Sequence, residues 1–335
     1  MKLIVPMAGR GTRLRPHTHV TPKPLLPVAG RTMVERIVET FAGALPTGFE
    51  EAMFILGPDF GDGVRQQLTE IADRFGIRAS FGVQETARGT AHAVQQAGDA
   101  LDGEVVIVFA DTLFEMGTPD LDADAVVWTM TVDDPSRFGV VVQDDAGRIT
   151  DFVEKPDTPI SYEAIVGIYY VRDGAGLRRE IQYLLDHNVT GKGDEYQLTD
   201  ALDRMLKAGL TFKTASVDEW LDCGTIPALK DTMELVLAKD GQNGKHGTVE
   251  PDAVVIEPVY VGPGATVRGS VVGPNVSIEG GATVEGSTLR DTIVFADAHV
   301  AGSALHGSVV GHHATVRDTA GTLNIGDHAT VGPEA

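Results

Sequence analysis

The sequence predicts an α/β domain with a mostly parallel sheet, followed by a short left-handed parallel β-helix. In residues 1–237, short apolar runs of strand length alternate with segments whose apolar residues recur at three- and four-residue spacing. After residue 247 an aliphatic residue recurs every five or six positions, often followed by glycine. The 335-residue chain is long enough for both domains.

The first region contains five candidate strands, at 3–6, 53–56, 105–110, 125–132 and 166–171. Helical spacing of apolar residues falls between them, at 33–41, 64–75, 90–97 and 177–185. Two further runs, 139–142 and 148–153, are joined through the turn-forming residues 144–147 and predict a hairpin. Alternation of this kind predicts a sheet covered by helices.

A helix-like stretch at 227–239 leads into a polar, glycine-rich run. We therefore expect a catalytic domain over 1–239, a linker over 240–252 and a β-helix over 253–335. The hexapeptide pattern is clearest at 261–266, 272–277, 278–283, 310–315 and 325–330. In a β-helix the aliphatic residue of each hexapeptide points inward and small residues occupy the corners. Because every candidate site residue precedes 240, a chain ending near Lys239 is expected to keep its activity.

Composition excludes several classes of protein. The formal charge of −21 would repel a phosphate backbone, which argues against a nucleic-acid partner. No apolar run approaches the ~18 residues of a membrane span, and Met1-Lys2 leads directly into the first strand, so we expect a cytoplasmic protein. A single cysteine, Cys223, excludes an intramolecular disulfide, and no Cys/His spacing suits zinc. Any metal should be bound through oxygen.

A glycine-rich turn directly follows the first strand. Such a turn lets backbone N–H groups approach phosphates, and nearby cations can neutralise a triphosphate. The glycines alone are also compatible with an ordinary strand-to-helix turn. The paired basic residues favour a triphosphate site made by Ala8, Gly9, Gly11, Thr12, Arg13 and Lys23.

This segment resembles the signature of nucleoside-diphosphate-sugar pyrophosphorylases, Gly-x-Gly-Thr-Arg-Leu followed by Pro-Lys-Pro-Leu-Leu-Pro. The resemblance extends over the whole chain and is greatest to glucose-1-phosphate thymidylyltransferases and uridylyltransferases that bear a C-terminal β-helix. It implies a Rossmann-like sheet of the kind found in nucleotide-sugar glycosyltransferase (GT-A) domains. It also implies Mg²⁺ as cofactor, a nucleoside triphosphate and a hexose 1-phosphate as substrates, and a homo-oligomer.

The segment from Gln84 to Ala93 resembles the family's base-recognition element. The resemblance implies that the Gln84 amide reads a pyrimidine edge and that the Gly89 backbone completes the contact. A Gln amide carries both a donor and an acceptor, which matches uracil or thymine. A solvated Gln before a helix capped by Thr90 is the structural alternative.

Two aspartates are the candidate metal ligands. Asp111 ends a very apolar strand, which places its carboxylate at the edge of the sheet where ligands bind in α/β proteins. Asp222 lies in a Trp-x-Asp-x-Gly-Thr element that resembles the family's second metal-binding segment. Two carboxylates suffice for Mg²⁺, which fills its other positions with phosphate and water oxygens. The flanking Ala110 and Thr112 depart from the family's usual residues.

The resemblance places the sugar phosphate near the predicted hairpin. Glu154 would bind sugar hydroxyls and Lys155 the phosphate, with Gly139 and Val166 on the strands that line this pocket. Taken alone, a Glu-Lys pair beside proline is usually a solvated loop. A later stretch at 195–200 resembles another family element, or equally the polar entry to a helix.

These residues together predict in-line displacement at the α-phosphorus by the sugar phosphate, with release of pyrophosphate. Arg13, Lys23, Asp111 and Asp222 would be catalytic. One alternative is a bifunctional enzyme whose β-helix also transfers acetyl groups, and another is a regulatory paralogue that binds nucleotide sugars without turnover. The β-helix histidines favour a structural or oligomerisation role over a second active site: His299, His306, His312, His313 and His328.

Overall fold

The computed structural model describes residues 1–9, 11–45, 47–240 and 246–333. The chain forms two compact units, and each unit is built from two separate segments of the sequence. The first consists of Met1–Gly9 and Glu35–Trp220, and the second of Arg10–Val34 and Leu221–Ala335. The glycine-rich loop therefore belongs to the same unit as the C-terminal repeats.

The first unit contains a nine-stranded mixed sheet. Its four neighbouring parallel strands are, in spatial order, β6 (Val105–Val108), β1 (Lys2–Pro6), β4 (Glu51–Leu56) and β5 (Arg78–Val83). The antiparallel strand β11 (Glu163–Val171) pairs with β6 on one side and with β8 (Ala125–Thr131) on the other. β12 (Phe212–Ser216) runs parallel to β8, and the hairpin of β9 (Gly139–Gln143) and β10 (Ile149–Glu154) forms an edge of the sheet.

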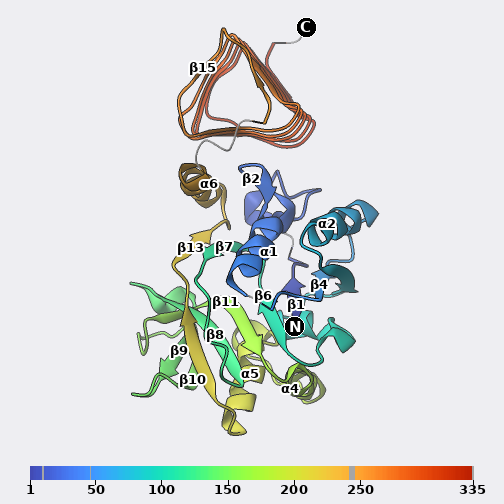
Figure 1. Cartoon of the computed structure of the whole chain (residues 1–335), viewed down its shortest axis with the longest axis vertical. Helices are drawn as coiled ribbons and strands as arrows, with labels where there is room; N and C mark the ends of the chain where they lie inside the picture. The colour runs from blue at the N-terminus through green and yellow to red at the C-terminus, as the bar shows by residue number, and fades with distance from the viewer. Residues whose placement is uncertain (10, 46, 241–245, 334–335) are drawn as a thin grey trace. The chain divides into compact units, whose positions relative to one another are not determined.

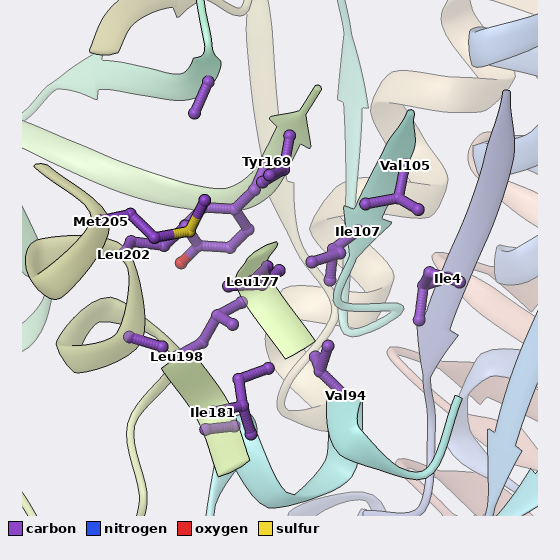
Figure 2. Close-up of a cluster of buried hydrophobic side chains, with 14 of the residues drawn as sticks. Ile4, Val94, Val105, Ile107, Tyr169, Leu177, Ile181, Leu198, Leu202 and Met205 are labelled. Atoms are coloured by element: carbon purple, nitrogen blue, oxygen red, sulfur yellow. The ribbon is translucent and has the colours of Figure 1, made fainter. Parts of the chain in front are cut away.

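Helices cover this sheet and bury their apolar stripes against it. They are α1 (Met33–Ala44), α2 (Asp62–Arg74), α3 (Thr90–Gln95), α4 (Gly174–Asp186) and α5 (Leu198–Lys207). Figure 2 shows aliphatic side chains of α3, α4 and α5 gathered against residues of β1, β6 and β11. Tyr169 of β11 lies in this cluster beside Leu202 and Met205, so its ring is part of the core. Burial of this apolar surface stabilises the unit.

The second unit contains α6 (Ile226–Asp240), the small antiparallel pair β2 (Pro27–Val28) and β3 (Arg31–Thr32), and a β-helix. Figure 1 shows the triangular cross-section of the β-helix coils. The β-helix has three parallel sheets. The first contains β14 (Thr248–Val249), β17 (Thr266–Arg268), β20 (Thr283–Glu285), β23 (His299–Ala301), β26 (Thr315–Arg317) and β29 (Thr330–Val331). The second contains β15 (Val254–Val255), β18 (Val271–Val272), β21 (Thr288–Arg290), β24 (Ala304–His306) and β27 (Ala320–Gly321). The third contains β16 (Val259–Val261), β19 (Val276–Ile278), β22 (Thr292–Val294), β25 (Val309–Val310) and β28 (Asn324–Ile325).

The inner columns of the β-helix follow the predicted pattern. Val267, Val284, Val300 and Val316 pair in register from coil to coil and are all fully buried. Each coil thus adds one aliphatic layer, which confirms the predicted fold class. No helix in the described ranges is long and apolar enough to cross a membrane.

The elements agree with the predictions in most places. The five predicted strands and the hairpin are present, but β5 and β12 were not predicted. Residues 241–245 of the predicted linker lie outside the described residues, and β14 already forms part of the β-helix within the predicted linker range.

Candidate active site

The glycine-rich loop folds back on itself. Gly11 has a positive φ of 57°, and a Cβ there would lie 3.0 Å from the Cβ of Lys23. Thr18 Oγ1 donates to the Gly11 carbonyl at 2.7 Å and closes the loop. The loop therefore brings Lys23, the first residue of a 3₁₀ turn (Lys23–Leu25), against its glycine-rich start. A side chain at position 11 would be strained in both conformation and space.

Arg13 and Asp222 meet at one turn. Asp222 ends β13 (Glu219–Asp222), and its Oδ1 accepts a hydrogen bond from the Gly224 backbone N–H at 2.6 Å. A Cβ on Gly224 would lie 2.8 Å from this Oδ1 and 3.2 Å from a guanidinium nitrogen of Arg13. A carboxylate and a cation that are far apart in the sequence thus face the same small space.

The same loop packs on the β-helix through a buried histidine. His17 is fully buried, and its Nε2 lies 2.6 Å from Oδ1 of Asn324. Its ring makes an edge-to-face contact with Phe295, with 5.4 Å between centroids, and Phe295 in turn stacks on His312. Burial lowers the pKa of His17, although its hydrogen bond to Asn324 opposes this effect. Because an amide oxygen can only accept, Nε2 donates to Asn324, and the lowered pKa favours the neutral ring.

A second contact with the β-helix lies at Gly30. Its backbone N–H donates to Oε1 of Glu279 at 3.2 Å, and Ser277 Oγ donates to the same oxygen at 2.7 Å. The ring of Tyr260 fills the space in which a Cβ of Gly30 would lie. We name the contacts of His17 and Gly30 with Asn324, Phe295, Glu279 and Tyr260 the loop brace. It ties the loop that carries Arg13 and Lys23 to several coils.

In the first unit, Gln84 and Gly89 lie together as predicted. Gln84 follows β5 and extends its pairing with β4, because its N–H donates to the Leu56 carbonyl at 2.9 Å. Its side chain is almost completely buried, and Nε2 lies 3.3 Å from the Gly89 carbonyl and 3.0 Å from Nδ1 of His92. The protein thus holds the Gln84 side chain in place, whereas the structural alternative expected a solvated glutamine.

Tyr196, which was not among the predicted site residues, holds this segment in place. Its N–H donates to the Arg88 carbonyl and its carbonyl accepts from the Ala91 N–H, both at 2.9 Å. The Arg88 guanidinium lies over the Tyr196 ring and donates to its hydroxyl at 2.9 Å. Gly89 has a positive φ of 111°, and a Cβ there would lie 2.5 Å from the Tyr196 carbonyl oxygen. The sequence signal was the family-like stretch at 195–200, which had an equally good interpretation as a helix entry.

The charges of Asp111 and Glu154 both affect the buried phenol of Tyr169. Asp111 follows β6 and is exposed, and Glu154 is the last residue of β10. The pKa of Tyr169 is raised, first by burial and then by the negative charges of Glu154 and Asp111. The two predicted acidic residues therefore lie near one side chain of β11. Tyr169 was also missed by the sequence analysis, where it was part of an apolar strand.

The predicted sugar-phosphate residues gather at the hairpin. Gly139 pairs with Glu154, and a Cβ on Gly139 would lie 2.8 Å from Glu154 Oε2. Lys155 Nζ lies 3.4 Å from Glu154 Oε1, and half of the lysine side chain is exposed. Val166 is buried in β11, and its side chain offers no polar group. The tilted contact of Phe138 with Trp220, 5.0 Å between centroids, adds an aromatic surface beside Gly139.

Comparison with known proteins shows the family to which the chain belongs. A match to the nucleotidyl transferase family covers residues 2–239. The chain belongs to this family. It is 29% identical to the low-salt glycan biosynthesis nucleotidyltransferase Agl11 of Haloferax volcanii, over 90% of this chain and 89% of that protein. It is likewise 29% identical to a glucose-1-phosphate thymidylyltransferase of Streptomyces antibioticus, over 99% of each.

A solved structure supports the fold. The crystal structure of a UDP-glucose pyrophosphorylase complexed with UDP-glucose has a TM-score of 0.57 and 24% identity to this chain. It covers 71% of this chain and 98% of the pyrophosphorylase. The chain is thus a sugar-1-phosphate nucleotidyltransferase of the nucleotide-sugar pyrophosphorylase type.

For this nucleotidyltransferase, the remaining predicted residues are Ala8, Gly9, Thr12 and the metal ligands. Ala8 and Gly9 lie shortly after β1, and the exposed Gly9 has open space where a Cβ would lie. Thr12 is the exposed first residue of a 3₁₀ turn (Thr12–Leu14). No group of three or more His, Cys, Asp or Glu side chains in the described ranges could hold a metal ion. Asp111 and Asp222 are both exposed carboxylates. Each is the kind of oxygen ligand that Mg²⁺ prefers, and Mg²⁺ needs only one or two protein carboxylates.

Proposed function

We propose that the enzyme joins a pyrimidine nucleoside triphosphate, UTP or dTTP, to a hexose 1-phosphate and releases pyrophosphate. The observation that carries this proposal is that the Arg13 guanidinium and the Asp222 carboxylate both approach Gly224, and that Arg13 comes from the loop that also positions Lys23. A cation and a carboxylate that face the same space suit a triphosphate and its metal. The thymidylyltransferase from Streptomyces antibioticus, similar over its full length, supports the choice of reaction.

In this proposal the chemistry is an in-line displacement. A phosphate oxygen of the hexose 1-phosphate forms a bond to the α-phosphorus, the bond from the α-phosphorus to the bridging oxygen breaks, and pyrophosphate leaves with that electron pair. Arg13 and Lys23 stabilise charge on the triphosphate and on the leaving group. Lys155 holds the attacking phosphate, and Glu154 accepts hydrogen bonds from sugar hydroxyls. Positioning by these side chains supplies much of the rate enhancement.

Asp111 and Asp222 would hold Mg²⁺, with phosphate oxygens and water as further ligands. When bound, the cation neutralises negative charge on the reacting phosphates. We further propose that the enzyme acts in the cytoplasm as a homo-oligomer.

The proposal is tested with a matrix of nucleoside triphosphates against hexose 1-phosphates, with pyrophosphate release as the readout. UTP and dTTP are expected to be used at least tenfold better than CTP, ATP or GTP, because unpaired polar groups in a closed pocket cost about 1–3 kcal/mol each. Preference for a purine nucleotide would contradict the pyrimidine assignment. No pyrophosphate from any pair would contradict the reaction itself.

The metal assignment is tested with Asp222→Asn. A neutral amide loses the charge that binds a hard cation, so turnover should fall by about 100-fold or more, with part of it recovered at high Mg²⁺ concentration. Asp218→Asn is the matched control, because Asp218 is an exposed aspartate close in sequence. Equal activity of the two variants at limiting Mg²⁺ would exclude Asp222 as a ligand.

A further inference from the structure

The Gln84 amide nitrogen is already used inside the protein. One of its neighbours is the Gly89 carbonyl, which can only accept a hydrogen bond, so the group that faces it must be the amide NH₂. The same nitrogen lies 3.0 Å from Nδ1 of His92. The two amide hydrogens are thus assigned to two acceptors, and the side chain has no donor left for a ligand.

The pKa of His92 is shifted in the direction that this arrangement requires. Nδ1 accepts from Gln84 only when the ring is neutral and its proton is on Nε2. Burial lowers the pKa of His92, the nearby Arg88 lowers it further, and a backbone hydrogen bond with Thr86 acts in the opposite direction. His92 lies on α3, one turn after the Gly89 that Tyr196 holds in place. Both acceptors that orient the Gln84 amide therefore have fixed positions.

The oxygen of the Gln84 amide remains for a ligand. No described residue donates a hydrogen bond to Oε1. Oε1 is also not one of the described polar atoms that are both buried and without a partner, so it stays accessible to solvent. An outward-facing acceptor recognises a ring N–H. Uracil and thymine carry such a group at N3, whereas the N3 of cytosine has a lone pair that would face the lone pairs of Oε1.

We propose that His92 is a positioning residue for base recognition, which holds Gln84 so that Oε1 accepts the N3–H of a uracil or thymine ring. This inference rests on the proposed pyrimidine specificity and refines it. Discrimination against cytosine comes from one acceptor held in a fixed direction, and not from a donor and an acceptor together. Without His92 only the longer contact with the Gly89 carbonyl, at 3.3 Å, still orients the amide, so rotation that presents its NH₂ to the N3 of cytosine costs less.

The test compares His92→Leu with His92→Asn. Leucine removes the acceptor at similar size, whereas Asn places Oδ1 close to where Nδ1 lies and keeps an acceptor for the Gln84 amide. We expect His92→Leu to lower the ratio of kcat/KM for UTP to that for CTP by about tenfold, and His92→Asn to retain most of it. The KM for hexose 1-phosphate should not change in either variant. Gln95→Leu, on the same helix and paired with Gln182, is the matched control.

Three results would overturn the inference. They are an unchanged UTP-to-CTP ratio in folded His92→Leu, equal losses for both nucleotides, and equal effects of the leucine and asparagine variants. Circular dichroism and thermal unfolding establish that the variants are folded. If the wild-type enzyme shows no turnover with any pyrimidine nucleotide, the proposed function fails. The inference is then tested separately by calorimetric binding of UTP and CTP, where the same change in ratio is expected.

Discussion

Several glycines of the candidate site are explained by what a side chain would strike. At Gly89 a Cβ would meet the Tyr196 backbone, at Gly139 the Glu154 carboxylate, and at Gly224 the Asp222 carboxylate. At Gly139 and Gly224 the absent side chain leaves room for a carboxylate that is proposed to act on the sugar or the metal, and at Gly89 it leaves room for the backbone that holds the Gln84–Ala93 segment. Gly139 and Gly224 do not have a positive φ, so the nearby carboxylates and not the backbone conformation explain why glycine occupies these two positions.

His17 provides a prediction of pH dependence at the residue scale. Its folded-state pKa is lowered, chiefly by burial; the Asn324 hydrogen bond and Asp327 oppose this, and His312 adds to it. In the unfolded chain the ring titrates near pH ~6.5, so below that pH the unfolded state binds more protons and the free energy of unfolding falls. We expect the Tm to decrease from pH 7.5 to pH 5.5 and the decrease to be smaller in His17→Gln, which can still donate to Asn324.

The matched control is His19→Gln, which replaces an exposed histidine of the same loop. Its Tm should follow the wild-type pH profile. The partly buried His312 also has a lowered pKa and acts in the same direction, so His17→Gln should flatten the profile only in part. Parallel profiles for wild type and His17→Gln would show that His17 does not contribute.

At the scale of elements, the loop brace joins a functional loop to a repeat structure. Residues 11–34 have little regular structure: two 3₁₀ turns, the β2–β3 pair and the start of α1. Loops of this kind are usually the less stable part of a protein. Here Tyr260, Glu279 and Asn324 come from three different coils, each packed on its neighbours by in-register strands. The coils therefore give a rigid surface to a segment that has little stability of its own.

Tyr260→Ala tests whether this surface matters for catalysis. Removal of the ring leaves a cavity beside Gly30 and should cost a few kcal/mol of stability, about 3 for a large aromatic side chain. If the loop positions Arg13 and Lys23, the KM for the nucleotide should rise several-fold while the KM for hexose 1-phosphate stays within about twofold. Tyr260→Phe keeps the ring and should retain most of the stability and of the nucleotide affinity that Tyr260→Ala loses. A lower Tm with unchanged nucleotide KM would limit the brace to a structural role.

At the scale of the whole molecule, the division of the chain differs from a simple series of domains. Residues 10–34 belong to the unit that contains the β-helix, whereas Gln84, Asp111 and Glu154 belong to the other. The separation at residues 239 and 240 therefore stays a prediction about independent folding. The contacts of His17 and Gly30 argue against the expectation that a chain ending near Lys239 keeps its activity.

Two truncations measure this dependence. A chain ending at Lys239 loses the whole brace, and one ending at Asp318 loses Asn324 but keeps Tyr260, Glu279 and Phe295. We expect calorimetric UTP affinity to fall in both, more in the shorter chain, because the loop loses successive contacts. Thermal unfolding checks that each protein is folded. A folded chain ending at Lys239 with full UTP affinity would show that the loop needs no support from the β-helix.

Much of the architecture could be predicted because it depends on neighbours in sequence. The buried strand β6, the hairpin of β9 and β10 and the aliphatic columns of the coils all show their periodicity locally. β5 could not be predicted in this way. All six of its residues are at least partly exposed, so it has no apolar run, and its strand conformation follows from pairing with β4.

By itself the sequence determined the fold class and the hexapeptide repeat, and it predicted a phosphate-binding role for the loop and the candidate acidic and basic residues. Only the tertiary structure decided that Arg13 meets Asp222 at Gly224, that His92 takes up the Gln84 donor, and that His17 reaches Asn324. The reason is physical. Periodicity and turn chemistry act over a few residues, whereas these arrangements depend on how separate segments of the chain pack against one another.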